Sequence, residues 1–359
     1  MFLKHLEIKN VRSISLYEKD FTNGINLIYG KNGVGKTSIL EAIHTLSISK
    51  SFRSGYRQNI QKTKTEFMSI VGDLSGKQTN KIAYRKNGEE YKIKINNTKV
   101  RKVSELIGKF PSIVLSPEDT DIVSGGNNAR LTYINKILSI SSKEYLKTLS
   151  HYNKIIKIRN KCLVNNKHYN EIVIWDEQLS PLAIKIWKHR EQFFNEFNNE
   201  FQSLWAKIMP TINATVQYKN PVKDDQKKLI TRLFERVDKD KLRGQTGAGP
   251  HKDSVNFFFG DIDIKNQASQ GEKKFFLVVL KIAEAKYIHQ KTNQKPVLLL
   301  DDLFAKLDRS RGKKILQLIN NKYQTFITTT DNSVESYFDD FDKINFIKLK
   351  KNEQLCSVV

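Results

Sequence analysis

The chain has 359 residues and a formal net charge of +23, from 61 Lys and Arg against 38 Asp and Glu. Its hydrophobic content of 39% excludes an intrinsically disordered chain, and its length exceeds the usual range of a single core. We therefore expect two domains, or one domain with an insertion. The charge favours a polyanionic partner, nucleic acid before a membrane surface, and a merely solvated basic surface is the alternative explanation.

Cysteines and apolar runs exclude several classes of protein. The two cysteines, Cys162 and Cys356, lie far apart without metal-ligand spacing, so neither a disulfide framework nor a zinc site is expected. Residues 1–6 do not resemble a signal peptide, and no run of about 18 apolar residues occurs. These features predict a cytoplasmic protein without a membrane partner.

The N-terminal third is predicted to be mostly strands. Residues 2–8 alternate between apolar and polar side chains, as an opening strand does. Residues 67–98 have the pattern of a β-meander, with a hairpin turn at Gly88. Between these segments, residues 25–29 form a short apolar run, and an amphipathic helix begins at Ser38 after a glycine-rich loop.

That loop has the strongest signal in the chain. The phosphate-loop pattern G-x-x-x-x-G-K-[ST] is matched at every fixed position by Gly30, Lys31, Asn32, Gly33, Val34, Gly35, Lys36 and Thr37. The glycines allow backbone N–H groups to point at phosphate oxygens, Lys36 can reach the β- and γ-phosphates, and Thr37 can hold Mg²⁺. A glycine-rich turn that binds nothing is the alternative. The complete pattern between a strand and a helix favours binding of a nucleoside triphosphate, ATP.

The middle of the chain has a helical texture. Apolar residues recur at three-and-four spacing over residues 131–156 and again over 172–208, with a polar connection at 160–170. This pattern predicts an antiparallel coiled-coil arm, and an ordinary helical hairpin packed on the globule is the alternative. Pro181 is expected to start or kink the returning helix.

Strand character resumes after the helices. Residues 214–219 are a predicted strand, residues 224–241 a charged helix, and residues 255–264 a hairpin. The intervening segment 246–253 is rich in glycine, so we expect a loop outside the core.

Two further segments have residues suited to binding or hydrolysing a nucleotide. Ser269 and Gly271 precede a long apolar helix through Tyr287, where they offer a hydroxyl and N–H groups to an anion or act only as an N-cap. Asp301 and Asp302 follow a wholly apolar strand, at the strand end where ligands bind in parallel sheets. Asp301 is placed to hold Mg²⁺ and Asp302 to orient or deprotonate the attacking water, although carboxylates also occur at strand ends without function.

Six motifs in this order and spacing resemble the RecF recombination-mediator family, over essentially the whole chain. They are residues 30–37, 50–53, 116–119, 249–253, 269–272 and 298–302. The resemblance implies an α/β fold, an ABC-type, SMC-like P-loop ATPase head with a mixed β-sheet and an inserted antiparallel coiled-coil or helical arm. The implied division is residues 1–125 and 213–359 for the two halves of the head, and residues 126–212 for the arm.

The resemblance also implies roles for individual residues. Ser269, Gln270 and Gly271 match the signature motif that contacts the γ-phosphate held by a second subunit. Asp308 resembles the D-loop residue, and Arg12 the basic residue near the nucleotide. Asp302 resembles the catalytic carboxylate, with Lys36 beside the phosphates.

Three departures from the pattern predict slow hydrolysis. Thr330 stands where many ABC ATPases have a switch histidine, and Ala305-Lys306 replaces the usual serine and its neighbour. The Q-loop glutamine has no clear counterpart, although residues 116–119 occupy that part of the chain. The resemblance therefore implies a slow, DNA-stimulated ATPase that acts as a switch.

The implied function is in recombinational DNA repair and replication-fork maintenance. The family resemblance implies an ATP-dependent homodimer on duplex or gapped DNA that helps to load RecA recombinase together with RecO and RecR. An SMC-like chromosome-organising head is the main alternative, but the insertion is much shorter than in that class. A transporter ATPase is disfavoured by the helical arm and by the basic charge.

The basic residues that contact DNA are the least determined by the sequence. Lys92 and Lys94 are expected on the polar face of a strand whose other face is apolar, so they would point at water or at phosphates. Arg53 and Arg57, close in sequence to the phosphate loop, are expected to extend this surface and to couple it to the nucleotide.

Overall fold

The computed structural model describes residues 1–53, 60–76, 80–222, 225–305, 307, 309–330, 337, 338, 341 and 344–350. Contacts divide the chain into two compact units, of which the first is formed by Met1–Thr120 with Ser269–Val359 and the second by Asp121–Ala268. The chain leaves the first unit once and returns once, as in a domain with an insertion. No helix in the described part of the chain is both long and apolar enough to span a bilayer.

A five-stranded parallel sheet forms the centre of the first unit. Its strands, in spatial order, are β14 (Ile344–Lys348), β3 (Ile25–Tyr29), β13 (Thr325–Thr329), β12 (Val297–Leu300) and β8 (Ser112–Leu115). Every residue of β8, β12 and β13 is buried. Continuous apolar strands such as residues 297–300 are typical of a sheet that is covered on both faces.

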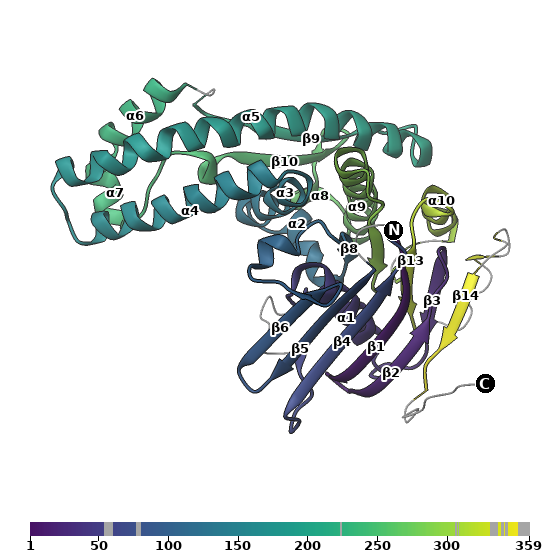
Figure 1. Cartoon of the computed structure of the whole chain (residues 1–359). Helices are drawn as coiled ribbons and strands as arrows, with labels where there is room; N and C mark the ends of the chain where they lie inside the picture. Colours follow the sequence, from purple (N-terminus) through teal and green to yellow (C-terminus); the bar gives the residue numbers. More distant parts are fainter. Residues whose placement is uncertain are drawn as a thin grey trace. The chain divides into compact units, whose positions relative to one another are not determined.

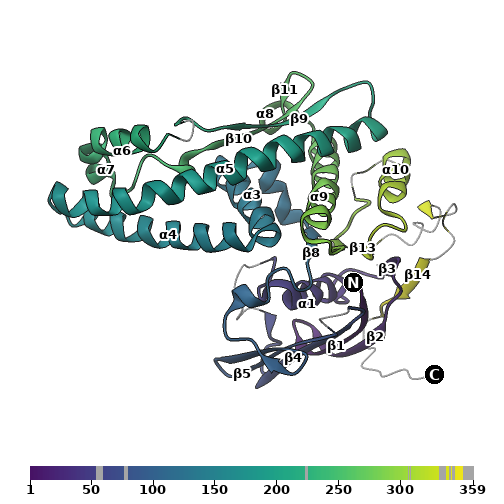
Figure 2. The ribbon, with the colours of Figure 1, turned by 45° about the horizontal axis from the view of Figure 1, so that its top comes forward.

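A six-stranded antiparallel sheet forms the second layer of this unit. In spatial order it contains β2 (Ile14–Asp20), β1 (Leu3–Val11), β4 (Phe67–Leu74), β5 (Lys81–Asn87), β6 (Glu90–Ile95) and β7 (Thr98–Lys99). The predicted opening strand and meander are therefore present. Helix α1 (Lys36–Ile48) contacts strands of both sheets (Figure 2). Almost all of its residues are buried because it is covered on two sides.

The remaining helices of the first unit are α9 (Gln270–Thr292) and α10 (Arg309–Ile319). Helix α9 packs against β8 and is buried around most of its circumference from Phe275 to Ile288. Two 3₁₀ turns, η2 (Val103–Glu105) and η3 (Pro117–Asp119), flank β8, and α2 (Thr120–Ser124) carries the chain out of this unit.

The second unit is built from helices packed on a small sheet (Figure 1). Its longer helices are α3 (Asn127–Ser141), α4 (Lys143–Val164) and α5 (Tyr169–Ile208). The sheet has the order β11 (Ile262–Asp263), β10 (Ser254–Phe259), β9 (Ala214–Lys219), and the short helices are α6 (Gln226–Glu235), α7 (Val237–Arg243) and α8 (Ile264–Gln267). The first helix of the predicted pair, residues 131–156, is divided at Ser142 into α3 and α4. Helix α4 packs against α5 as predicted, but α5 also packs on β9 and α6. The hairpin is thus part of a compact unit.

The unit boundary differs from the one expected from the sequence. Residues 213–268 were expected in the C-terminal half of the head, but they belong to the inserted unit. The reason is that β9 and β10 bury their apolar face against helices of the insertion, with the Val216 N–H donating to Asn198 of α5 at 2.9 Å. The charged segment expected as one helix is split into α6 and α7.

Pro181 does not start α5 but lies inside it. A proline inside a helix removes the N–H that would bond to the carbonyl four residues earlier, here that of Glu177. The Ser180 hydroxyl donates to this same carbonyl oxygen at 3.4 Å and so replaces the missing donor.

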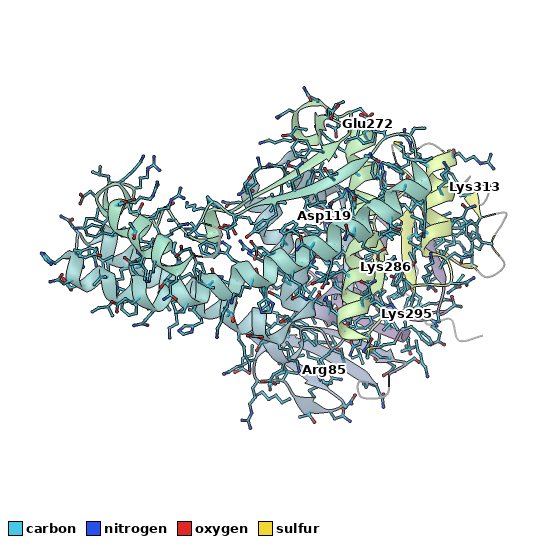
Figure 3. The ribbon with its side chains drawn as sticks, turned by 90° about the horizontal axis from the view of Figure 1, so that it is seen from above. Arg85, Asp119, Glu272, Lys286, Lys295 and Lys313 are labelled. Atoms are coloured by element: carbon cyan, nitrogen blue, oxygen red, sulfur yellow. The ribbon has the colours of Figure 1, made fainter. Side chains whose placement is uncertain are left out.

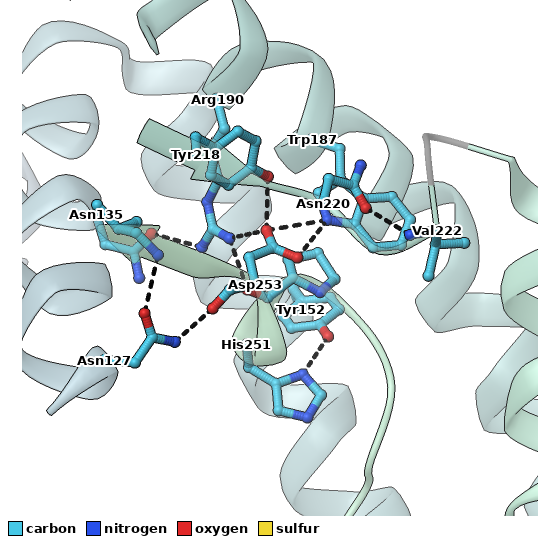
Figure 4. Close-up of polar contacts among 12 residues, drawn as sticks. Asn127, Asn135, Tyr152, Trp187, Arg190, Tyr218, Asn220, Val222, His251 and Asp253 are labelled. Atoms are coloured by element: carbon cyan, nitrogen blue, oxygen red, sulfur yellow. Dashed lines mark hydrogen bonds and ion pairs between the residues drawn. The ribbon is translucent and has the colours of Figure 1, made fainter. Parts of the chain in front are cut away.

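The glycine-rich segment 246–253 is largely buried, with only Lys252 exposed, although we expected a loop outside the core. The carboxylate of Asp253, 0% exposed, accepts hydrogen bonds from the Trp187 indole at 2.9 and 3.1 Å and from the Tyr218 hydroxyl at 2.6 Å (Figure 4). Arg190 pairs with it and also donates to the Pro250 carbonyl at 2.6 Å. The segment is therefore the polar centre of the second unit.

Candidate nucleotide site

The phosphate loop connects β3 to α1 at one edge of the parallel sheet. Gly30, Gly33 and Gly35 have φ angles of 151°, 79° and 104°, which L-amino acids with side chains rarely adopt. A Cβ at Gly30 would also lie 2.5 Å from the carbonyl oxygen of Leu349. The glycine pattern therefore follows from the backbone path that turns the strand into the helix.

Lys36, the first residue of α1, folds back over this loop. Its Nζ donates to the carbonyl oxygens of Gly30 at 2.7 Å and Lys31 at 2.9 Å. Burial lowers the pKa of Lys36, and the negative charges of Asp301 and Asp302 act in the opposite direction. The ammonium group is thus held inside the loop by two backbone carbonyls.

Thr37, Asp301 and Thr328 bring α1, β12 and β13 together at the strand ends. The Thr37 hydroxyl lies 3.0 Å from both carboxylate oxygens of Asp301, and the Thr328 hydroxyl donates to the Asp301 Oδ1 at 2.6 Å. Burial raises the pKa of Asp301, against the hydrogen bonds from Thr328 and Thr37, with Asp302 and Glu118 adding to the rise. The sequence analysis did not single out Thr328, because only the fold brings β13 next to β12.

The residues present fit a magnesium ion bound with a nucleotide. A hydroxyl and a carboxylate are hard oxygen ligands, and Mg²⁺ usually binds one or two such groups together with phosphates and water. Within the described ranges, no group of three or more His, Cys, Asp and Glu could hold a metal ion. Thr37 and Asp301 would therefore hold the ion only together with phosphate oxygens.

Asp302 has a constrained backbone at the same edge. Its φ is 50°, in the left-handed region that aspartate tolerates better than most residues. Its N–H donates to the Thr328 hydroxyl at 2.9 Å, and its carbonyl accepts from the Nζ of Lys274 at 2.7 Å. These two bonds fix the residue whose carboxylate is expected to act on water.

A pocket of about 720 Å³ opens beside these groups. The predicted nucleotide residues that line this pocket are Asn32, Gly33, Gly35, Lys36, Thr37, Asp301, Asp302 and Arg12. Gly30, Lys31 and Val34 are not among the described residues of its lining and shape the loop from behind. Pro117 and Thr330 also line the pocket, so the expected nucleotide residues meet at one place.

Arg53, which was expected to extend the DNA surface and couple it to the nucleotide, also lines this pocket. The Ser51 hydroxyl accepts from the Arg53 N–H at 3.0 Å and itself donates to the carboxylate of Glu41. Glu41 is fully buried in α1 and accepts from Arg12 at 2.7 and 2.8 Å. The hydrogen bond with Glu41 raises the pKa of Arg12, against the effect of burial.

Glu41 therefore orients two basic elements of the pocket wall, the Arg12 side chain directly and the backbone of Arg53 through Ser51. Sequence analysis missed it. The signal was an acidic residue inside the apolar run of α1, next to the loop.

Ser269, Gln270 and Gly271 lie at the N-terminus of α9. Ser269 is the N-cap, and its side chain and N–H form a capping box with Glu272 at 2.8 and 3.3 Å. These bonds lower the pKa of Glu272. Ser269 and Gln270 are exposed, and the described lining of the pocket includes none of the three residues.

The other predicted residues lie elsewhere. Lys92 and Lys94 are exposed on β6, and Lys92 lines a separate hollow of about 630 Å³ on the antiparallel sheet. Asp308 and Arg57 fall outside the described residues, as does Lys306.

Comparison with known proteins relates the whole chain to one family. A model described as the RecF/RecN/SMC N terminal domain matches residues 2–353. The chain is 31% identical over 339 residues to the DNA replication and repair protein RecF of Bacteroides fragilis, covering 92% of this chain and 91% of that protein. It is 33% identical over 329 residues to RecF of Chloroherpeton thalassium, with coverages of 86% and 89%.

Solved structures give the same relationship. A structure of RecF with ATPrS, described as a recombination mediator in the RecFOR pathway, matches with a TM-score of 0.86 and 29% identity, over 98% of this chain and 96% of that one. RecF with ATP matches with a TM-score of 0.84 and 30% identity over 92% of each chain. An Smc head, at 15% identity and a TM-score of 0.57 over 98% of this chain and 95% of that one, shares the fold.

Proposed function

The chain belongs to the RecF family, and from this premise we propose that it is an ATP-dependent switch that binds DNA in recombinational repair. The observation that carries the proposal is the convergence of Lys36, Thr37, Asp301 and Asp302 on one open pocket. The related structures contain ATP or ATPrS, which supports ATP as the ligand.

In this proposal the chain's own groups divide the work on ATP. Lys36 contacts the β- and γ-phosphates, and Thr37 with Asp301 holds Mg²⁺, which would neutralise phosphate charge when bound. The carboxylate of Asp302 accepts a proton from the water that attacks the γ-phosphorus, and ADP leaves. Thr330, in place of a histidine, offers no imidazole to the γ-phosphate, which supports slow turnover.

The proposed active form is a dimer. Because Ser269 and Gln270 are exposed, and neither they nor the half-buried Gly271 line the described pocket of their own chain, the motif is available to the γ-phosphate of a second copy. The N-terminus of α9 would add N–H groups and a positive dipole end to that contact. ATP would then hold two copies together, and hydrolysis would release them.

The outer face of the antiparallel sheet is the proposed DNA surface. Strand register aligns Lys9 with Ser69, Ser69 with Arg85, and Arg85 with Lys92, so these residues form one row across β1, β4, β5 and β6. Neighbouring strands are about 4.8 Å apart, so the row spans roughly 14 Å. Each DNA strand presents a phosphate about every 3.4 Å along the helix axis, so the row is long enough for several contacts.

The basic residues of this row differ in whether an ion pair already engages their charge. Lys9 pairs with Glu7, but Arg85 and Lys92 are exposed and enter no ion pair among the described residues (Arg85 is labelled in Figure 3). Lys94 lies in the adjacent row, which continues through Ala83 and Val71 to Glu7. We therefore assign DNA contact to Arg85 and Lys92 rather than to Lys94, which narrows the surface expected from the sequence.

The proposed partners follow from the family. The related structures are described as recombination mediators of the RecFOR pathway, which supports RecO and RecR as partners and loading of RecA recombinase as the output. A chromosome-organising head of the SMC type is the second candidate, but the inserted unit here is compact and closes on its own small sheet.

Sedimentation with and without ATP and a gapped duplex tests the proposal. We expect ATP to convert monomers to dimers and to increase the fraction bound to DNA. Ser269→Arg should bind ATP but stay monomeric, because the substituted residue acts on the other copy. Wild-type protein that binds DNA equally with and without ATP would refute the switch, and loss of ATP binding in Ser269→Arg would refute action on the second copy.

A further inference from the structure

Helix α9 carries two lysines on one face that reach two separate loops of the nucleotide pocket. Lys274 donates to the carbonyl oxygens of Asp302, at 2.7 Å, and Ala305, at 2.5 Å. Lys281 donates to the carboxylate of Asp119 at 3.1 Å. The two lysines are seven residues apart, or about two helical turns, so they project from the same side of the helix.

Both contacted loops belong to the pocket. Asp302 and Pro117 line it, and Pro117 is two residues before Asp119. Asp119 also holds its own loop in shape, because its Oδ2 accepts from the N–H of Ser116 at 2.8 Å. The two loops follow β12 and β8, which are neighbouring strands. A shift of either loop on nucleotide binding therefore acts on α9 through a lysine.

The two lysine contacts can fix the position of α9 along its own axis. From Phe275 to Ile288 the helix is packed mainly by apolar side chains, whose contacts are not directional. The Lys281 side chain is only 2% exposed, and its Nζ also lies 3.7 Å from Glu284, which is fully buried. Burial lowers the pKa of Lys281, but Asp119 and Glu284 more than offset this, so its pKa is raised and the charge is kept.

We propose that Lys274 and Lys281 are positioning residues that transmit the occupancy of the nucleotide pocket to the N-terminus of α9. That end of the helix carries Ser269, Gln270 and Gly271. The role of these three residues toward a second copy rests on the proposed function, but the transmission itself is within one chain. ATP would thus place the N-terminus of α9 for docking before the second copy arrives.

The decisive variant is Lys281→Met combined with Glu284→Gln. Lys281→Met alone would leave Glu284 buried without its cation, so the second change removes that charge and protects folding. Lys274→Met tests the other contact without leaving a buried carboxylate behind. Lys281→Arg keeps the charge and is the conservative variant. Lys286→Met, on the same helix in Figure 3, is the matched control for loss of a lysine.

Hydrogen exchange of amides 270–276 is measured in protein dilute enough to be monomeric, with and without ATP. We expect ATP to change the exchange in wild type, Lys286→Met and Lys281→Arg, and to leave it unchanged in Lys281→Met/Glu284→Gln. Lys274→Met should reduce the change. ATP affinity should stay within about twofold of wild type in the double variant, whereas ATP-induced dimerisation should weaken about tenfold, a typical size for coupling between sites.

An equal response to ATP in the double variant and in wild type would overturn the proposal. A lost response together with lost ATP binding would also overturn it, because the lysines would then act on binding itself. If wild type fails to dimerise with ATP, the proposed function fails, while exchange in the monomer still decides whether the transmission exists.

Discussion

Asp253 in the second unit and Asp301 in the first are both buried carboxylates, exposed by 0% and 9%, but different groups surround them. Asp253 accepts from Trp187 and Tyr218 and pairs with Arg190. Asp301 accepts only from two hydroxyls and, among the described residues, has no ion pair.

The difference separates a structural carboxylate from a ligand-binding one. Burial raises the pKa of both groups, and Arg190 is the largest opposing influence at Asp253. The charge of Asp253 is already balanced by an ion pair and several hydrogen-bond donors. Asp301 has no ion pair among the described residues and lies at an open strand end, so an added cation can stabilise its charge. The comparison predicts that loss of a partner affects folding in the second unit and ligand binding in the first.

The largest expected effect is at the Asp253 network. Arg190→Met should lower the free energy of unfolding of the second unit by about 3–5 kcal/mol, because it leaves a buried carboxylate without its cation. Urea unfolding of the whole chain measures this, followed by the fluorescence of the three tryptophans, which all lie in the second unit, and by circular dichroism for the first unit. The matched change at the other carboxylate, Asp301→Asn, should cost under about 1 kcal/mol, since no ion pair is broken and Lys36 keeps its hydrogen bonds to the carbonyls of Gly30 and Lys31. Equal losses in the two variants would contradict the comparison.

The next effect sharpens the division between Asp301 and Asp302. Asp301→Asn should weaken binding of ATP in the presence of Mg²⁺, because a metal ligand is lost. Asp302→Asn should bind ATP normally, lower turnover about a hundredfold through loss of the proton acceptor, and accumulate ATP-bound dimers. Equilibrium binding of a fluorescent ATP analogue and phosphate release separate the two outcomes, and equal binding defects would disprove the assignment.

Features formed by residues close together in the sequence could be predicted, and features formed by residues far apart in the sequence could not. The phosphate loop was recognisable because strand, loop and helix are contiguous, and the carboxylates after residues 297–300 because a buried strand ends there. The Asp253 network was not, since Arg190 lies 63 residues from Asp253 and Asn127 lies 126 residues away.

Two local features depend on a neighbouring side chain that the sequence pattern does not reveal. Pro181 is accommodated inside α5, where the Ser180 hydroxyl donates to the carbonyl that the proline leaves without a donor. Arg53 was expected to extend a DNA surface and couple it to the nucleotide, and Ser51 and Glu41 hold its backbone so that it lines the nucleotide pocket. Neither the spacing of hydrophobic residues nor the number of charged residues predicts a contact of this kind.

A pH series tests the raised pKa of Asp301. As the pH falls through this raised pKa, the carboxyl is protonated and cannot hold Mg²⁺, so the gain in ATP affinity due to Mg²⁺ should decrease. The decrease should begin at a higher pH than for an exposed aspartate and approach about tenfold per pH unit. The ratio of ATP affinities with Mg²⁺ and with EDTA measures it, and Asp301→Asn should give a smaller, pH-independent ratio. A wild-type ratio that is flat down to the pKa of an ordinary aspartate would refute the assignment.

The smallest effect concerns the surface, where the surroundings of two exposed lysines differ. Arg85 and Lys92 lie in one row and line the same hollow, whereas the row of Lys94 continues through Ala83 and Val71 to Glu7. Lys92→Glu should weaken binding to duplex DNA severalfold and reduce the slope of log affinity against log salt by about one, equally for unrelated sequences, because only phosphates are contacted. Lys94→Glu has the same charge change on the same strand face and should leave both quantities near the wild-type values. Equal effects of the two variants would mean that the general potential of the basic surface, and not the Arg85–Lys92 row, attracts DNA. No effect of either variant, with ATP binding intact, would exclude this face of the sheet as the DNA surface.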